Sequence, residues 1–228
     1  MSQPIDVRET AKTRARYDRI APFYDLMEAF TEQRFDPWRQ QLWSLVSGGQ
    51  VLEVGVGTGK NFPYHPARAE VTGIDLSERM LARARRKAEK LGHPIELREM
   101  DVQQLDFPDD TFDAATATFV FCSVPDPARG LRELARVVKP GGHILLLEHV
   151  RIDRPAFIGK LMDWLDPLVV RVMGAHINRR TAETVQRAGL EVERVEELAS
   201  RGLVKLIVAR PLAPDGTSVD EGSGGGPS

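Results

Sequence analysis

The stretch that most constrains this chain is VLEVGVGTGK at residues 51–60, where three glycines follow an apolar run at alternate positions. This pattern predicts a buried strand that ends in a tight turn opening toward a helix. Glycine suits such a turn because it tolerates positive φ and lets a ligand approach the backbone closely. Asp75 closes a second apolar run about 20 residues after Gly55, and an acidic residue at that distance is well placed to bind the hydroxyls of a ribose.

The spacing of the glycines argues against a dinucleotide site. The dinucleotide fingerprint is G-x-G-x-x-G, whereas Lys60 stands here where the third glycine is required. Glu53 at the mouth of the turn would repel a pyrophosphate and attract an ammonium group. S-adenosylmethionine, which has a ribose, an adenine and an amino-acid end but no phosphate, fits these features. The alternative interpretation is a purely structural glycine turn.

Three further motifs extend the pattern: GIDLS at 73–77, MDVQQLDFPDDTFD at 100–113 and LRELARVVKPGGHILLLEH at 131–149. With EVGVGTG they make the chain resemble the class I S-adenosylmethionine-dependent methyltransferases over about residues 17–211. It most resembles the branch that holds quinone-ring methyltransferases and the bacterial soluble phosphatidylethanolamine N-methyltransferases. The resemblance implies a Rossmann-like α/β fold. Its seven-stranded, mostly parallel sheet has an antiparallel last strand, helices on both faces and an N-terminal helical lid.

The sequence divides into three segments. Residues 1–34 form a basic, aromatic-rich lid, in which we expect Pro22 to separate two helical pieces, and a new helix should begin near Phe35. Residues 35–211 form the methyltransferase domain, where alternating strands and helices predict a doubly wound sheet closed by a C-terminal hairpin. Residues 212–228 are rich in glycine and serine and predict a disordered tail.

Composition limits the cellular setting. The net charge of −2 gives no general attraction to nucleic acid, and the single cysteine, Cys122, fits a reducing compartment and leaves no metal-binding pair. No apolar run approaches the length of a membrane span, and the N-terminus lacks a secretory signal core. We therefore expect a cytoplasmic monomer without metal or obligate protein partner, associated peripherally with the inner face of the cell membrane.

The cofactor site should lie outside the carboxyl ends of the strands, where strand order reverses. From the motifs and the resemblance, the cofactor-binding residues are Tyr17, Glu53, Gly55, Gly57, Gly59, Asp75, Leu76, Asp101, Val102 and Phe119. Asp75 should hold the ribose, Asp101 the adenine amino group and Glu53 the methionine end, and Phe119 should lie near the sulfonium. Leu76 could equally be a core residue, and Asp101 a plain turn residue.

The acceptor site should combine residues of the lid with those at the ends of the fourth and fifth strands. The candidate catalytic residues are Tyr24, Glu148 and His149, with a hydrogen-bonded structural pair as the alternative for the last two. Candidate substrate-binding residues follow an apolar insertion at His176, Asn178, Arg179 and Arg180. Arginine suits a lipid phosphate, although surface charge and an N-cap would explain the same residues.

These features favour a phosphatidylethanolamine N-methyltransferase that acts on an anionic membrane surface through its basic N-terminal segment, with S-adenosylhomocysteine as the product. Methylation of a quinone ring or another small hydrophobic acceptor at carbon is the alternative. A nicotinamide oxidoreductase is disfavoured by the glycine spacing. A non-catalytic lipid-binding module is disfavoured by the intact cofactor motifs.

Overall fold

The computed structural model describes residues 4–150, 160, 162–164, 166, 181–199 and 203–212, without the side chains of residues 25–33. Its helices are α1 (Val7–Ser44), α2 (Glu78–Leu91), α3 (Pro127–Val137) and α5 (Thr181–Arg187), with a short 3-10 helix η1 (Phe62–Tyr64). Its strands are β1 (Gly49–Val54), β2 (Ala69–Asp75), β3 (Glu96–Glu99), β4 (Phe112–Thr118), β5 (Val138–His149), β6 (Leu190–Glu197) and β7 (Val204–Pro211).

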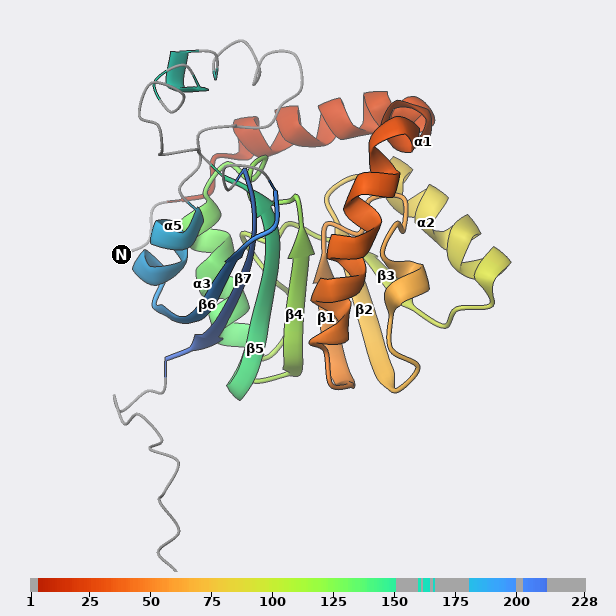
Figure 1. Ribbon diagram of the computed structural model, residues 1–228. Coiled ribbons are helices and arrows are strands. Elements are labelled where there is room, and N and C mark those ends of the chain that lie inside the picture. Colours follow the sequence, from red (N-terminus) through yellow and green to blue (C-terminus); the bar gives the residue numbers. More distant parts are fainter. Residues whose placement is uncertain are drawn as a thin grey trace, which may run out of the picture.

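The strands form one seven-stranded sheet in the order β3-β2-β1-β4-β5-β7-β6 (Figure 1). The pairs from β3 to β5 are all parallel, whereas β7 runs antiparallel to both β5 and β6. The predicted fold is therefore confirmed, including the closing hairpin. Strand order reverses between β1 and β4, so a crevice should open at the carboxyl ends of these two strands.

Helices cover both faces of the sheet. Successive strand residues point to opposite sides, so apolar side chains lie on each face and pack against a helix. On one face Leu42 and Trp43 of α1 pack with Val51 of β1. On the other face Leu131 of α3 packs with Leu52, the next residue of β1. The inner parallel strands β1, β2 and β4 are buried along most of their length, as parallel strands usually are, whereas the edge strands β3 and β6 are largely exposed.

The ends of α2 and α3 follow from local sequence. The Ser77 side chain accepts the N–H of Met80 at the start of α2, and Gly92 ends that helix in the left-handed conformation with φ 61°. Asp126 accepts the N–H of Arg129 in the same way at the start of α3. These caps fix where each helix meets the strand ends.

The N-terminal region differs from the prediction. α1 is one helix of 38 residues that contains both Pro22 and Pro37, so Pro22 does not separate two helices and no new helix starts at Phe35. Figure 1 shows that α1 instead turns a corner: one arm lies across the upper ends of the strands, and the other runs down one face of the sheet. Proline lacks the N–H that closes a helical turn, so it weakens the helix at that point. Where packing holds both arms, the helix bends there without ending.

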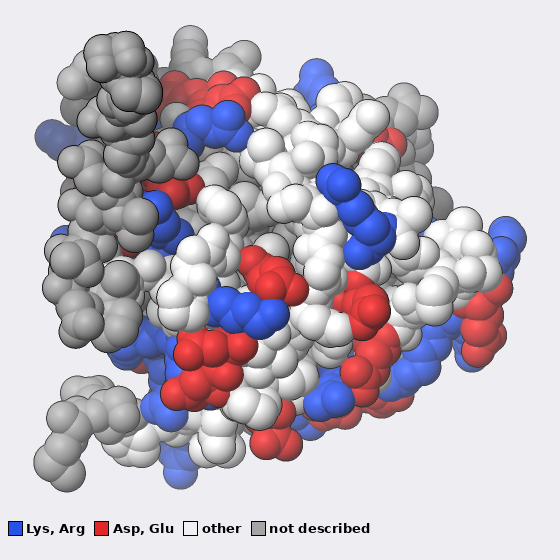
Figure 2. All heavy atoms as spheres, turned by 90° about the horizontal axis from the view of Figure 1, so that it is seen from below, with Lys and Arg blue, Asp and Glu red and all other residues white. Residues whose placement is uncertain are grey.

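The predicted apolar insertion and C-terminal tail fall mostly outside the described residues. No helix within the described ranges is long and apolar enough to cross a bilayer. On the end of the molecule opposite the crossing arm of α1, acidic and basic side chains are interspersed rather than gathered by sign (Figure 2).

Candidate functional site

A cavity of about 100 Å³ lies where the strand order reverses, beneath the crossing arm of α1. Most of the predicted site residues line it. They come from the crossing arm of α1, which forms the roof of the cavity, from the glycine turn and from the ends of β2, β3 and β4. These residues are Tyr17, Tyr24, Gly55, Gly57, Asp75, Leu76, Asp101, Val102 and Phe119. The sequence motifs therefore meet in one enclosed space.

The glycine turn leaves room for a ligand on the cavity side. Gly55 and Gly57 have φ of 66° and 55°, in the region that favours glycine. A Cβ at Gly55 would overlap a methyl group of Val120, whereas a Cβ at Gly57 would meet no atom within 4 Å. Gly55 is thus required by packing, and Gly57 keeps its part of the cavity open.

Asp75 braces this turn from the end of β2. Its carboxylate accepts the backbone N–H of Gly57 at 2.9 Å and that of Ser77 at 2.9 Å. Burial raises the pKa of Asp75 to about 6, with a smaller contribution from the nearby Glu53, and the backbone donors oppose this rise. The carboxylate is thus fixed in place at the cavity wall, where it can accept hydrogen bonds from paired hydroxyls such as those of a ribose.

Asp101 connects the cavity to its roof. Its carboxylate accepts the N–H of Gln103 at 2.9 Å and the hydroxyl of Thr10, on α1, at 3.3 Å. Gln103 also donates to Thr10 at 3.2 Å, so the three side chains form one cluster. The roof therefore rests on the carboxylate that was expected to bind an adenine amino group.

Further polar contacts hold the crossing arm of α1. Ser77 donates its hydroxyl to Asp18 at 2.6 Å, and Arg14 forms an ion pair with Glu99 at 2.6 Å. Both partners lie at or next to the carboxyl ends of β2 and β3. Together with Thr10, these contacts place the predicted lid directly over the cavity.

Glu53 is not among the residues that line this cavity, so its predicted contact with an ammonium group stays a prediction. Its side chain is buried, and its carboxylate accepts the Asn61 amide at 2.7 Å and contacts His65 Nε2 at 2.9 Å. The His65 ring in turn contacts His93 Nε2 at 2.8 Å. Both carboxylate oxygens are therefore occupied by protein groups behind the glycine turn.

Gly59 is also absent from the cavity wall. It has φ of 81°, and a Cβ at this position would overlap the ring of Phe62. The third glycine is therefore required by the packing of η1 against the turn rather than by a ligand. The predicted cofactor contact of Gly59 stays a prediction.

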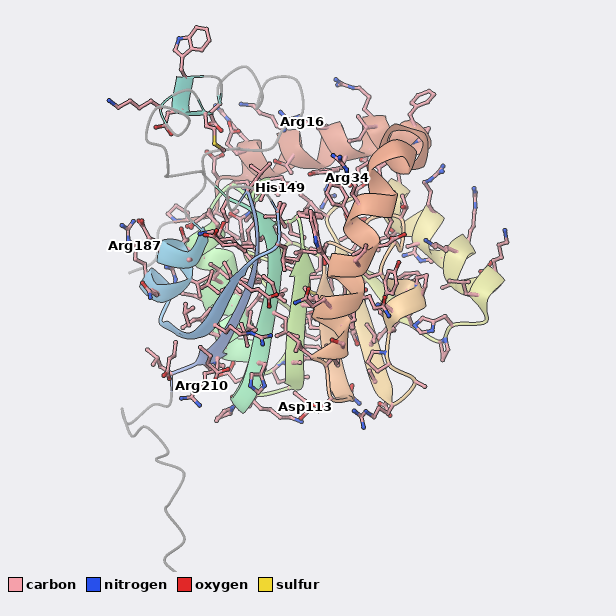
Figure 3. The ribbon with its side chains drawn as sticks, viewed as in Figure 1. Arg16, Arg34, Asp113, His149, Arg187 and Arg210 are labelled. Carbon is pink, nitrogen blue, oxygen red and sulfur yellow. The ribbon has the colours of Figure 1, made fainter. Side chains whose placement is uncertain are left out.

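The end of the cavity next to β4 is aromatic. Phe119 follows β4 with φ of 57°, an uncommon conformation for an aromatic residue. Its ring stacks on His149 with centroids 4.3 Å apart and contacts Phe35 of α1 at 5.0 Å. Figure 3 shows His149 at the upper end of β5, below the arm of α1 that carries Arg16 and far from Asp113 at the opposite end of the sheet. His149 therefore stands behind Phe119 rather than on the cavity wall.

Glu148 has a different role from the predicted one. It is fully buried, does not line the cavity, and accepts the N–H groups of Val120 and Phe121 at 2.9 Å each through a single oxygen. Its other oxygen has no hydrogen-bond partner, and burial raises the pKa of Glu148 to about 7 while the backbone donors oppose this rise. Glu148 thus orients the loop that carries Phe119, and the geometry gives it no contact with an acceptor.

The remaining acceptor residues fall into two groups. Tyr24 lines the cavity from α1, and its ring centroid lies 5.7 Å from the Lys60 ammonium. The four predicted substrate-binding residues lie outside the described residues: His176, Asn178, Arg179 and Arg180. Tyr24 is thus the predicted catalytic residue that the structure places on the cavity wall.

Several residues of the site were not predicted from the sequence. They are Thr10 on the crossing arm of α1 and Gln103 beneath it, and Arg39, Asn61 and His65 behind the glycine turn. The segment NFPYHP at 61–66 is unusually rich in proline and aromatic residues, and this composition was a signal for Asn61 and His65. No local pattern distinguishes Arg39 from other helix arginines.

Comparisons with known proteins match this chain to methyltransferases. A family model described as a methyltransferase domain matches residues 52–146. A phosphatidylethanolamine N-methyltransferase of Cereibacter sphaeroides is 51% identical over 109 residues, which cover 47% of this chain and 54% of that protein. A demethylmenaquinone methyltransferase of Thermus thermophilus is 37% identical over 148 residues, which cover 62% of this chain and 67% of that protein.

A solved structure of a methyltransferase is also similar to this chain. An S-adenosylmethionine-dependent methyltransferase from Mesorhizobium loti superposes with a TM-score of 0.56 at 26% identity, covering 76% of this chain and 96% of that one. Among the curated relatives, the match spans about half the length of the first protein and about two thirds of the second.

Proposed function

The chain belongs to the class I S-adenosylmethionine-dependent methyltransferases, and from this premise we propose that it methylates the amine of phosphatidylethanolamine. The observation that carries the proposal is the 51% identity to a phosphatidylethanolamine N-methyltransferase, which is higher than the 37% identity to the demethylmenaquinone methyltransferase. The longer alignment to the latter keeps carbon methylation of a quinone ring as the second candidate.

The cavity suits this class of reaction. When bound, S-adenosylmethionine supplies an electrophilic methyl group on a sulfonium. The residues that would hold it are Gly55, Gly57, Asp75 and Asp101, because they offer an open backbone turn and two fixed carboxylates on the cavity wall. An aromatic ring, Phe119, lines the same space and can stabilise a nitrogen that becomes cationic on methylation.

An amine acceptor also has to lose a proton, because only the neutral amine has a lone pair for attack. The phospholipid amine is mostly protonated at neutral pH, so a route for its proton is needed. Tyr24 on the cavity wall and His149 behind Phe119 are the predicted catalytic groups that the structure leaves near this end of the cavity. We expect Tyr24→Phe to lower turnover without changing the affinity for S-adenosylhomocysteine.

A labelling experiment tests the proposed acceptor. The protein is incubated with methyl-labelled S-adenosylmethionine and either phosphatidylethanolamine vesicles or a demethylated menaquinone, and the product is identified by mass spectrometry. Asp75→Ala serves as the inactive control. Label on the lipid nitrogen supports the proposal, whereas label on the quinone ring and none on lipid favours the second candidate.

We also propose that the roof helix contacts an anionic membrane surface. Arg8, Lys12, Arg19 and Phe23 are exposed and are spaced by 4, 7 and 4 residues, which places them on one face of α1. Phe23 is 61% exposed although it is a large apolar side chain. A basic face that carries an exposed aromatic ring is typical of helices that bind lipid head groups.

Sedimentation with phosphatidylglycerol vesicles tests this second part. Neutralising Arg8 and Arg19 to glutamine should weaken binding by about 1 kcal/mol for each charge, and added salt should weaken binding of the unchanged protein. The matched control neutralises Arg86 and Lys90, which are exposed on α2. If both double variants sediment equally, α1 is not the membrane contact.

A further inference from the structure

Arg39 is a buried cation that has almost no partners. It lies on the arm of α1 that packs against the sheet, and its side chain is only 6% exposed. One terminal nitrogen donates to the Asn61 side-chain oxygen at 2.8 Å, whereas Nε is buried without a hydrogen-bond partner. Within the described ranges, no carboxylate forms an ion pair with this guanidinium.

This arrangement is unfavourable as it stands. A buried charge is normally paired, because its lost hydration must be replaced by a counter-ion and by hydrogen bonds to its remaining donors. A guanidinium has five donors in a planar fork that matches a carboxylate or a phosphate. The buried Nε of Arg39, which has no hydrogen-bond partner, is therefore a donor that a carboxylate or phosphate oxygen could fill.

The position of Arg39 shows where such an anion would come from. Its guanidinium carbon is 5.8 Å from the ring centroid of Phe119, and its partner Asn61 also donates to Thr118 at 3.2 Å. Phe119 and Thr118 both line the cavity, but Arg39 does not. The guanidinium is thus separated from the cavity by the Phe119 side chain, and a ligand would reach it only if that ring were displaced.

The local backbone is consistent with such a movement. Phe119 has φ of 57°, a conformation that is costly for an aromatic residue and that clusters at ligand-binding sites in proteins. A second buried cation, Lys60, is 7% exposed and lies near Tyr24, which lines the cavity. Two buried cations are therefore found near this end of the cavity, and the Asn61 side chain that binds Arg39 also donates to the Glu53 carboxylate.

We propose that Arg39 is an anion-binding residue of this site, which takes either the carboxylate of the cofactor's amino-acid end or the phosphate of the acceptor head group. The first source depends only on membership of the methyltransferase family. The second source rests on the proposed function. In both cases the bound oxyanion fills the donors that Asn61 leaves free.

Calorimetry with two cofactor analogues separates the two sources. S-adenosylhomocysteine carries the amino-acid end, whereas 5′-methylthioadenosine has the same adenosine thioether without it. If Arg39 binds the carboxylate, Arg39→Gln should lower the affinity for S-adenosylhomocysteine about 10- to 100-fold, as expected for loss of a charged hydrogen bond. The affinity for methylthioadenosine should stay unchanged. Arg39→Lys should recover part of the loss, and the exposed Arg86→Gln is the control.

If Arg39 instead binds the acceptor phosphate, both analogues bind Arg39→Gln normally and the KM for phosphatidylethanolamine rises at least tenfold. Urea unfolding of the ligand-free variants supplies an independent readout, because removing an unpaired buried charge should leave stability unchanged or higher. Equal loss of both analogues together with lower stability would show a structural role and overturn the proposal. Unchanged affinity for both analogues would also overturn the proposal if lipid kinetics are unchanged as well, or if the protein methylates no lipid.

Discussion

Replacing Glu148 by glutamine should make the protein more stable at alkaline pH, although this residue is completely buried. In the folded protein the carboxyl has a pKa raised to about 7 by burial, whereas its ordinary value is 4.5. The folded state therefore holds the proton more tightly than the unfolded state. Stability from this group is fully present below pH 4.5 and is lost as pH rises through 7.

The size of the effect follows from the two pKa values. At 1.36 kcal/mol for each pH unit between 4.5 and about 7, ionisation of Glu148 lowers the free energy of unfolding by about 3 kcal/mol. The physical source is the burial of the charged carboxylate: one oxygen of Glu148 accepts the N–H groups of Val120 and Phe121, and the other is buried without a hydrogen-bond partner. Glutamine is uncharged at every pH and keeps one oxygen acceptor for these donors.

Urea unfolding of both proteins between pH 5 and pH 8 measures this effect. The stability of Glu148→Gln relative to wild type should rise by about 2.5 kcal/mol across the range. Other groups that titrate in this window, such as Asp75, are present in both proteins and cancel in the comparison. Glu89→Gln on the surface of α2 is the control and should show no trend. A difference that stays constant or falls with pH would refute the reasoning.

Three other changes give equally definite expectations. Asp75→Ala should weaken binding of S-adenosylmethionine by roughly 1.5–3 kcal/mol in calorimetry, because it removes charge-assisted hydrogen bonds, while NAD should not bind either protein. Gly59→Ala should lower the free energy of unfolding in urea by about 1 kcal/mol more than Gly92→Ala does. Both positions have positive φ, but only at Gly59 would the added Cβ overlap a neighbouring ring. Thr10→Val should speed release of S-adenosylhomocysteine in stopped-flow measurements, since it removes the hydroxyl that joins the roof to Asp101.

The sequence predicted the parts of the fold that depend on neighbouring residues. The glycine turn and the closing hairpin are encoded within a few positions of where they occur. Pro22 was misinterpreted because a proline bends a helix or ends it depending on what each arm packs against. That packing is formed by strands far away in the chain.

The site shows the same division. Residues that follow strand ends, such as Asp75 and Asp101, reach the cavity because topology brings those ends together. The two buried glutamates, Glu53 and Glu148, were predicted to act at the site from their positions at strand ends, and each accepts hydrogen bonds from protein groups of other segments. A carboxylate at a strand end therefore predicts a polar network there, and only the folded partners show whether a ligand belongs to it.

The bend in α1 affects how fast the helix opens locally and how fast ligands enter and leave the site. Its crossing arm is held to the strand ends by polar contacts such as those of Thr10 and Asp18, whereas Leu42 and Trp43 anchor the other arm in the core. Local opening needs less free energy where few apolar contacts are lost. Amide hydrogens of α1 should therefore exchange fastest at its N-terminal end and slowest near Trp43. Ligands can then enter and leave through partial unwinding of the roof, while the sheet and its core stay folded.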